Sequence, residues 1–108
     1  MSYSLDLEKW IDAVAGAWRG VTKKKMFGGV GHLLNGNLVC GVYKNNLILR
    51  LGPDAAERVL REYPASPFDI TGRPMKGWVM IDETEINEEG FQKLLDAARH
   101  FVSGLPAK

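Results

Sequence analysis

The first twenty positions place apolar side chains three or four residues apart, which is the spacing of one face of an amphipathic helix. Ser4 stands before this stripe and belongs to the residue types that cap helix N-termini, whereas Gly20 follows the stripe and breaks the pattern. We therefore predict a helix from Ser4 to about Trp18, with one face packed on a sheet. The residues of the apolar stripe are Leu7, Trp10, Ile11, Val14 and Trp18.

Three segments with strand-like patterns follow, at about residues 24–34, 38–44 and 47–51. Asn35 and Gly36 lie between the first two segments and favour a type I′ turn, because both central positions of that turn need a positive φ. The second and third segments are also joined closely, which suits another tight turn. We predict an antiparallel meander. The last two strands have apolar residues on both faces, so cover on both sides of the sheet is compatible with the pattern.

A second helix and a further strand are predicted next. Pro53 suits the first turn of a helix that continues to about Glu62. A loop follows, in which Phe68 and Ile70 are expected to act as apolar anchors. The next strand is predicted at about residues 77–81.

The last helix is predicted to begin after Asn87, a good N-cap residue, and to end at Gly104. Its apolar residues at helical spacing are Phe91, Leu94, Leu95, Ala98 and Val102. The predicted order is αβββαβα, with about three helices. Antiparallel strands flanked by helices indicate an α+β fold, here a two-layer sandwich of a β-meander plus a further strand. Residues 1–108 are expected to form a single domain.

Composition narrows the class of protein. The chain has 108 residues, of which 45% are hydrophobic and 25% are charged, as in ordinary soluble domains. No apolar run approaches the roughly 20 residues that cross a bilayer. The first residues lack the pattern of a signal peptide. The single cysteine, Cys40, fits a reducing compartment as a free thiol. We expect a cytoplasmic protein with no membrane partner.

The charge is distributed unevenly along the chain. Residues 1–50 have seven Lys or Arg against three Asp or Glu, whereas residues 51–108 have seven against ten, and the formal net charge is +1. Such asymmetry is compatible with an electrostatic face for a partner. A domain whose main function is to bind nucleic acid usually has a larger excess of basic residues. A protein partner is therefore the first expectation, and nucleic acid stays open.

Glycines interrupt the first strand-like segment. Glycine in a strand costs stability, so Gly28, Gly29 and Gly31 indicate a bulge or the close approach of another backbone or a ligand. A phosphate-binding P-loop is disfavoured, because no Gly-Lys-Ser/Thr follows and His32 continues a strand. The alternative is structural: Gly29 and Gly31, beside Phe27, allow a helix or an aromatic ring to pack closely.

Five landmarks together resemble a known family. In chain order they are Lys24 and Lys25 before Met26-Phe27-Gly28-Gly29, the hairpin at Asn35-Gly36, Leu47-Ile48-Leu49-Arg50-Leu51, Gly72-Arg73-Pro74-Met75-Lys76-Gly77-Trp78, and Leu105-Pro106-Ala107-Lys108. With them the chain resembles the TfoX/Sxy N-terminal domain family of small bacterial domains. The resemblance implies an α+β fold and an association with regulation of DNA uptake genes, that is, competence.

The resemblance also marks residues of a structural motif and suggests a domain organisation. The motif residues are Met26, Phe27, Gly28, Gly29, Gly72, Pro74, Gly77 and Trp78. The full-length competence regulators that name the family have a second, C-terminal domain. The resemblance therefore implies that this chain is a stand-alone single-domain member, to which their transcriptional role does not transfer whole.

Five basic residues are the candidate binding site, for a protein or for nucleic acid: Lys24, Lys25, Arg50, Arg73 and Lys76. A lysine run is more often a solvated segment than a phosphate contact. Arg50 interrupts an apolar strand, so it either lies at an open sheet edge or pairs in a cleft. Arg73 and Lys76 flank a proline turn, which is either an ordinary connection or part of one positive groove with Trp78 or Phe27 as a stacking surface.

Catalytic and metal chemistry find little support. His32 and His100 lack the spacing of metal ligands and are expected at the surface or half-buried. Cys40 has apolar sequence neighbours and no local histidine or basic residue, so a packed core thiol is expected. No nucleophile-base set, carboxylate pair or metal cluster follows from spacing. We expect no enzyme activity, no cofactor and no metal.

The sequence therefore predicts a noncatalytic interaction module, an accessory regulator of transcription or DNA competence that acts through a protein partner in the transcription machinery. Weak binding of DNA or RNA through a basic groove is the first alternative. A small-ligand protein is another, favoured if a pocket converges on Arg50, His32 or Cys40. A homodimer through an exposed edge of the meander stays open.

Overall fold

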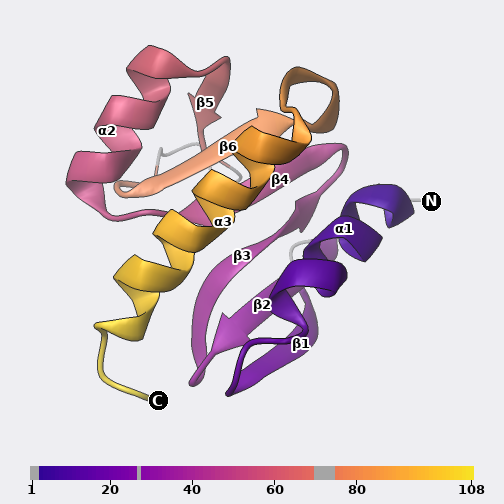
Figure 1. Cartoon of the computed structure of the whole chain (residues 1–108), viewed down its shortest axis with the longest axis vertical. Helices are drawn as coiled ribbons and strands as arrows, with labels where there is room; N and C mark the ends of the chain where they lie inside the picture. The colour runs from indigo at the N-terminus through magenta and orange to yellow at the C-terminus, as the bar shows by residue number, and fades with distance from the viewer. Residues whose placement is uncertain (1–2, 27, 70–74) are drawn as a thin grey trace.

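The computed structural model describes residues 3–26, 28–69 and 75–108 (Figure 1). Ile70 and the predicted motif and site residues Phe27, Gly72, Arg73 and Pro74 lie outside these ranges. In chain order the elements are α1 (Leu5–Ala15), β1 (Val21–Met26), β2 (Gly29–Leu34), β3 (Asn37–Tyr43), β4 (Asn46–Arg50), α2 (Pro53–Glu62), β5 (Ala65–Pro67), β6 (Trp78–Asp82), the short 3₁₀ helix η1 (Glu83–Glu85) and α3 (Glu88–Ser103). None of the helices in the described ranges is long and apolar enough to cross a membrane.

The strands form one antiparallel sheet in the order β1-β2-β3-β4-β6-β5. In Figure 1, α1 and α3 lie across the front of this sheet, with α2 beside β5 and β6. Residues of all three helices belong to the same core cluster as the sheet. We call this side the helix face and the opposite side the back face. The arrangement confirms the predicted α+β class.

Buried apolar residues lie on both faces of the sheet. The main core joins the helices to inward-facing strand residues such as Leu47, Leu49 and Ile81. A smaller cluster on the back face contains Ile48, Phe68 and Trp78. Phe68 is only 1% exposed, so its predicted role as an anchor is confirmed. The sheet is thus covered by helices on one side and partly by a connecting segment on the other.

Hydrogen-bonding side chains begin the first and last helices as predicted. Ser4 accepts a hydrogen bond from the Leu7 backbone N–H at 3.2 Å, and Asn87 accepts one from the Gly90 backbone N–H at 2.8 Å. Each cap satisfies a backbone donor that has no partner inside the helix. α1 ends at Ala15, earlier than predicted, although its apolar stripe is continued by the buried Trp18.

The single strand predicted over residues 24–34 is wrong in one respect, because the segment is a hairpin of two strands. Met26 pairs with Gly29, and Gly28 has a φ of +75°, a conformation that glycine adopts without strain. Gly28 thus belongs to a turn between two strands, whereas the glycine pattern predicts a bulge or a close approach within one strand. The later Asn35-Gly36 turn is confirmed, with φ values of +53° and +85°. β5 is a further short strand where a loop was expected.

Glycines in β2 and β3 allow their backbones to lie unusually close. A Cβ on Gly29 would overlap the carbonyl oxygen of Val42, and one on Gly41 would overlap the carbonyl oxygen of Val30. The predicted close approach of another backbone is therefore confirmed. The space over Gly31 is filled by the side chains of Met26 and Leu38 rather than by a helix or a ring.

We expect Gly29→Ala to lower the free energy of unfolding by about 2 kcal/mol, the scale of forced overpacking. The added methyl group would meet the backbone of β3, which cannot rotate away as a side chain can. Gly104→Ala is the matched control, since a Cβ there would be 3.5 Å from the Phe101 carbonyl oxygen, an ordinary contact. Urea denaturation of both variants measures the difference. Equal stability of the two variants would contradict the close-approach explanation.

Candidate functional site

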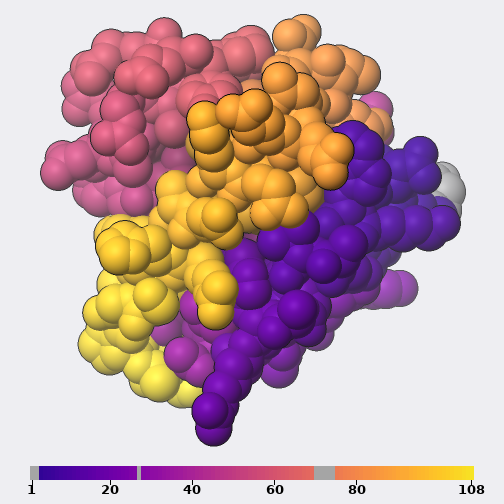
Figure 2. Space-filling view, in the orientation of Figure 1, coloured from indigo at the N-terminus to yellow at the C-terminus, as the bar shows by residue number. Residues whose placement is uncertain are grey.

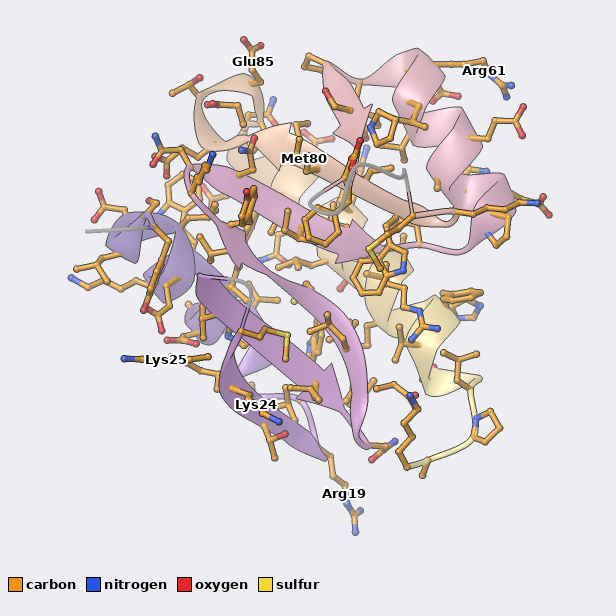
Figure 3. The ribbon with its side chains drawn as sticks, turned by 180° about the vertical axis from the view of Figure 1, so that it is seen from behind. Arg19, Lys24, Lys25, Arg61, Met80 and Glu85 are labelled. Carbon is orange, nitrogen blue, oxygen red and sulfur yellow. The ribbon has the colours of Figure 1, made fainter. Side chains whose placement is uncertain are left out.

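Lys24 and Lys25 point to opposite faces of the sheet, because successive side chains on a strand alternate. Lys24 pairs with Gly31, whereas Lys25 pairs with Val30, whose side chain belongs to the core under the helices. Figure 3, which views the back face, shows the two lysines leaving β1 in different directions. Both lie on an edge strand, where lysines discourage pairing with other chains.

Arg50 lies on a central strand, so its predicted alternative position at an open edge is wrong. β4 is flanked by β3 and β6, and Arg50 pairs in register with Trp78. The guanidinium carbon lies 5.5 Å from the centroid of the Trp78 ring, a cation–π arrangement. The five ion pairs among the described residues do not include Arg50. Its charge is therefore placed over an aromatic face and has no carboxylate partner within the described ranges.

Aromatic packing on the back face holds Trp78 under Arg50. The ring centroids of Phe68 and Trp78 are 5.9 Å apart, and those of Tyr43 and Phe68 are 6.0 Å apart. The Gly77 carbonyl accepts hydrogen bonds from the Leu51 and Gly52 backbone N–H groups at 2.9 and 3.1 Å. These contacts fix residues 76–78 against the end of β4.

A pocket of about 310 Å³ lies between α2 and the segment that leads into β6. Met75, Lys76 and Trp78 line the side of the pocket that this segment forms. Met75 is 36% exposed, and Lys76 is exposed at the same segment. We call Arg50, Met75, Lys76 and Trp78 the Arg50–Trp78 surface.

The structure brings together only part of the predicted basic site. Arg50 and Lys76 belong to one surface. Lys24 faces the same side, but three strand spacings of about 4.8 Å each separate β1 from β4. Lys25 lies on the other side of the sheet. Arg73 is outside the described residues, so its place in the predicted groove stays a prediction.

A buried histidine connects α1 to the sheet. His32 is 1% exposed, and its Nε2 lies 2.9 Å from Oδ1 of Asp12. Lys23 contacts the same two elements: its Nζ is 3.0 Å from Oδ2 of Asp12 and 2.6 Å from Oε2 of Glu8. The expectation of a surface or half-buried His32 is wrong, because the register of β2 turns this side chain toward α1.

His32 also stands opposite Cys40 in the register of β2 and β3. His32 lies on the preceding strand, so the sequence neighbours of Cys40 did not indicate this contact. Burial raises the pKa of the Cys40 thiol far above its ordinary value. The thiol therefore stays protonated inside the core, as predicted, although His32 and the Asp12 carboxylate lie near it. Within the described ranges, no group of three or more His, Cys, Asp or Glu side chains is arranged to hold a metal ion.

Burial lowers the pKa of His32 below its ordinary value, although the hydrogen bond with Asp12 opposes this effect. The neutral ring thus donates its Nε2 hydrogen to Asp12. Its buried Nδ1 has no hydrogen-bond partner among the described residues. Partial burial alone would raise the pKa of Asp12, but hydrogen bonds from His32 and Lys23 lower it overall. Asp12 is therefore a charged acceptor at neutral pH.

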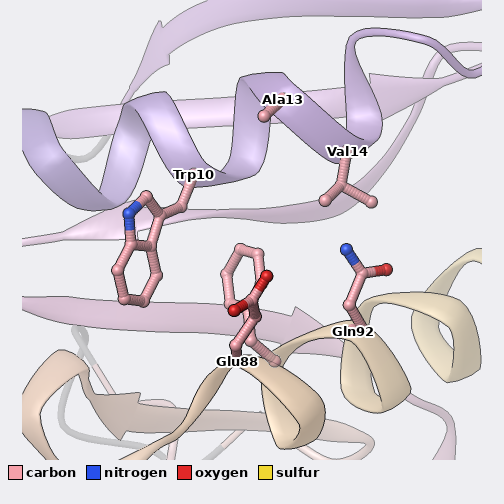
Figure 4. Close-up of a pocket in the computed structure, with 6 residues that line it drawn as sticks. Trp10, Ala13, Val14, Glu88 and Gln92 are labelled. Carbon is pink, nitrogen blue, oxygen red and sulfur yellow. The ribbon is translucent and has the colours of Figure 1, made fainter.

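A second pocket lies on the helix face, between α1 and α3. It has a volume of about 280 Å³. Its lining residues are Trp10, Ala13, Val14, Glu88, Phe91 and Gln92 (Figure 4). Trp10 was predicted as part of the buried stripe, but 48% of it is exposed. The position of Trp10 at the margin of the stripe is the only sequence signal for this pocket.

We expect His32→Gln to weaken the dependence of stability on pH. His32 has a lowered pKa in the fold, so the unfolded chain takes up a proton first as the pH falls below about 6.5. The free energy of unfolding therefore has its full value above that pH. It falls as the pH drops from about 6.5 toward the lowered pKa of His32 in the fold. Urea unfolding at pH 7.5, 6.0 and 5.0 measures the effect, and His100→Gln, which removes an exposed histidine, is the control. Parallel profiles for the wild type and His32→Gln would contradict this explanation.

Comparison with known proteins gives one match. No curated protein and no solved structure matches the chain. The model of the TfoX N-terminal domain family matches residues 12–101, which include most of the helices and strands described above. On this evidence of sequence the chain belongs to the TfoX N-terminal domain family.

Proposed function

We propose that this chain is a noncatalytic module in competence-related regulation, and that its Arg50–Trp78 surface docks on an acidic segment of a protein of the transcription machinery. The family supports the regulatory setting. The observation on which the proposal depends is the position of Arg50, over the Trp78 ring and without a carboxylate partner in the described ranges. A carboxylate of a partner would supply the missing counter-charge.

The surroundings of Arg50 favour recognition of a protein. Its guanidinium is a planar donor that binds carboxylates in a bidentate manner, and the ring beneath it restricts its orientation. Met75 and the adjacent pocket offer apolar contact beside this charge. Arginine, tryptophan and methionine are enriched in protein interfaces. The proposed partner segment therefore combines carboxylates with an apolar side chain.

Binding is favoured over catalysis by the state of the reactive groups. Cys40 is buried with a raised thiol pKa, and His32 is buried beneath α1. Neither lies on the Arg50–Trp78 surface. Groups that act on a substrate need access to it. On the Arg50–Trp78 surface, Met75 and Lys76 are exposed and Arg50 is partly exposed over the buried Trp78 ring.

The test is a pull-down from the native cytoplasm with the tagged chain as bait, with and without nuclease. We expect nuclease-resistant retention of RNA polymerase or a transcription factor. Retention should fall at least fivefold for Arg50→Met, which removes the charge but keeps an apolar side chain over Trp78, and for Lys76→Glu. The control is Arg19→Glu, at an exposed arginine between α1 and β1, at the other edge of the sheet.

Two outcomes would overturn the proposal. Retention unchanged by Arg50→Met and Lys76→Glu would exclude this surface as the docking site. Retention that disappears with nuclease would instead favour nucleic acid, whose phosphates the same cations would contact. In that case affinity for an oligonucleotide should fall steeply with salt.

A further inference from the structure

We propose that the groove between α1 and α3 binds a basic amphipathic helix of a partner protein, with one large apolar side chain of that helix seated beside Trp10, in the hollow over Ala13 and Val14. This groove lies on the helix face, away from the Arg50–Trp78 surface, and the inference does not depend on the function proposed above. Figure 2 shows α1 and α3 side by side on this exposed face of the molecule.

The shape of the groove suits a helix. Its walls are two helices that lie on the same sheet, and its lining residues come from successive turns of each. Trp10 and Phe91 meet edge to face, with ring centroids 5.6 Å apart. Ala13 has a small side chain and leaves space on the α1 side. A third helix that packs on two helices brings its ridges into such a groove, and apolar anchors spaced along it fill the hollow.

Trp10 packs against Phe91 and still leaves nearly half of its surface exposed. The indole is 48% exposed, although Phe91 beneath it is buried. Tryptophan is the residue most typical of binding hot spots, because it contributes a large apolar area at low entropic cost. Burial by a partner would remove this apolar area from water.

Carboxylates surround one end of the groove. Glu88 lines it, and Figure 4 shows its carboxylate directed into the space between the helices. The Ser4 hydroxyl donates a hydrogen bond of 2.7 Å to Glu83, which places the start of α1 beside the acidic segment 82–89. That segment has five Asp or Glu and no Lys or Arg. Both helices therefore present acidic residues at the same end.

Several of these carboxylates have no basic partner. The ion pairs of the described residues use Glu89, paired with Lys93, but not Asp6, Glu85 or Glu88. Carboxylates in the first turn of a helix stabilise it through the helix dipole, which explains why acidic residues stand at positions 6 and 88. It does not account for an exposed tryptophan beside them. An apolar hollow with an acidic end is complementary to a helix with an apolar face and lysines or arginines.

The far end of the groove has the opposite charge. Arg99 lies over the Trp18 ring, 5.2 Å from its centroid, on the side of α3 that faces α1. A helix with basic residues along its whole length would meet this arginine. We therefore expect the basic residues of the partner to be concentrated near one end of its helix.

The experiment uses the full chain with Arg50→Met, which removes the cation of the Arg50–Trp78 surface, and two labelled helical peptides of 18 residues. Both have leucines at i, i+3, i+4 and i+7 and one phenylalanine; one has four lysines near a single end, and the other has four glutamates at the same positions. Fluorescence anisotropy measures binding. We expect the lysine peptide to bind at least tenfold more tightly than the glutamate peptide.

Variants locate the site. Trp10→Ala and the groove-filling Ala13→Leu should each weaken binding of the lysine peptide at least tenfold. Met75→Ala, at an exposed apolar residue outside the groove, should not. Glu88→Lys should reduce or reverse the preference between the peptides, whereas Glu57→Lys, on α2, should leave it unchanged. Because Ala13→Leu removes no packing, its result holds even if Trp10→Ala is unstable.

Three outcomes would overturn the proposal. Binding of neither peptide would show that the groove does not accept a helix of this kind. Equal binding of both, or equal effects of Glu88→Lys and Glu57→Lys, would show that the acidic end has no specific role. Self-association in sedimentation velocity that Ala13→Leu abolishes would assign the groove to a second copy of the chain.

Discussion

The close contact between the backbones of β2 and β3 is the constraint on which much of the structure depends. Glycine at positions 29 and 41 allows each strand to meet a carbonyl oxygen of the other. The register shifts once along this pair, between His32 and Leu33, which is a β-bulge. Val39 and Cys40, next to one another in the sequence, are both fully buried in the main core. The bulge explains how neighbouring residues on one strand can both reach the same core.

The same register places the polar connection between α1 and the sheet. His32 turns toward α1 because it alternates with glycines that face the back of the sheet, and Asp12 receives it. A buried neutral histidine with one hydrogen bond is costly unless the surrounding packing is favourable. Here the packing of α1 supplies that stability through the fully buried Leu7 and Ile11. The position of α1, and with it one wall of the α1–α3 groove, follows from the sheet.

Local patterns predicted the features that depend on neighbouring residues. Helical spacing predicted α1 and α3, and Pro53 predicted the start of α2. The Asn35-Gly36 turn and the Asn87 cap were correct because their chemistry is complete within a few residues. The β1–β2 hairpin was missed because its turn lacks the Asn-Gly pair of the next turn, and its glycines suit a bulge equally well.

The candidate site was less predictable, since it depends on strand order. Arg50 is next to Trp78 only because β6 pairs with β4, and no local signal specifies that pairing. Lys24 and Lys25 are adjacent in the sequence but point to opposite faces of the sheet, because successive side chains on a strand alternate. The exposure of Trp10 depends on where α3 lies beside α1. The uneven charge of the two halves of the sequence also did not predict the acidic end of the groove, because that end combines carboxylates from both halves.

The two proposed surfaces lie on opposite faces of one sheet, and this separation has a physical consequence. Between them are the fully buried residues of β4 and β6, such as Leu47, Ile48 and Val79. A close-packed layer of this kind transmits strain but has little freedom to rearrange. Residues that share no partner across such a layer usually have additive effects on free energy. A basic, aromatic surface on one face and an acidic, apolar groove on the other can therefore bind different partners without competing, which is the arrangement that an adaptor between two proteins requires.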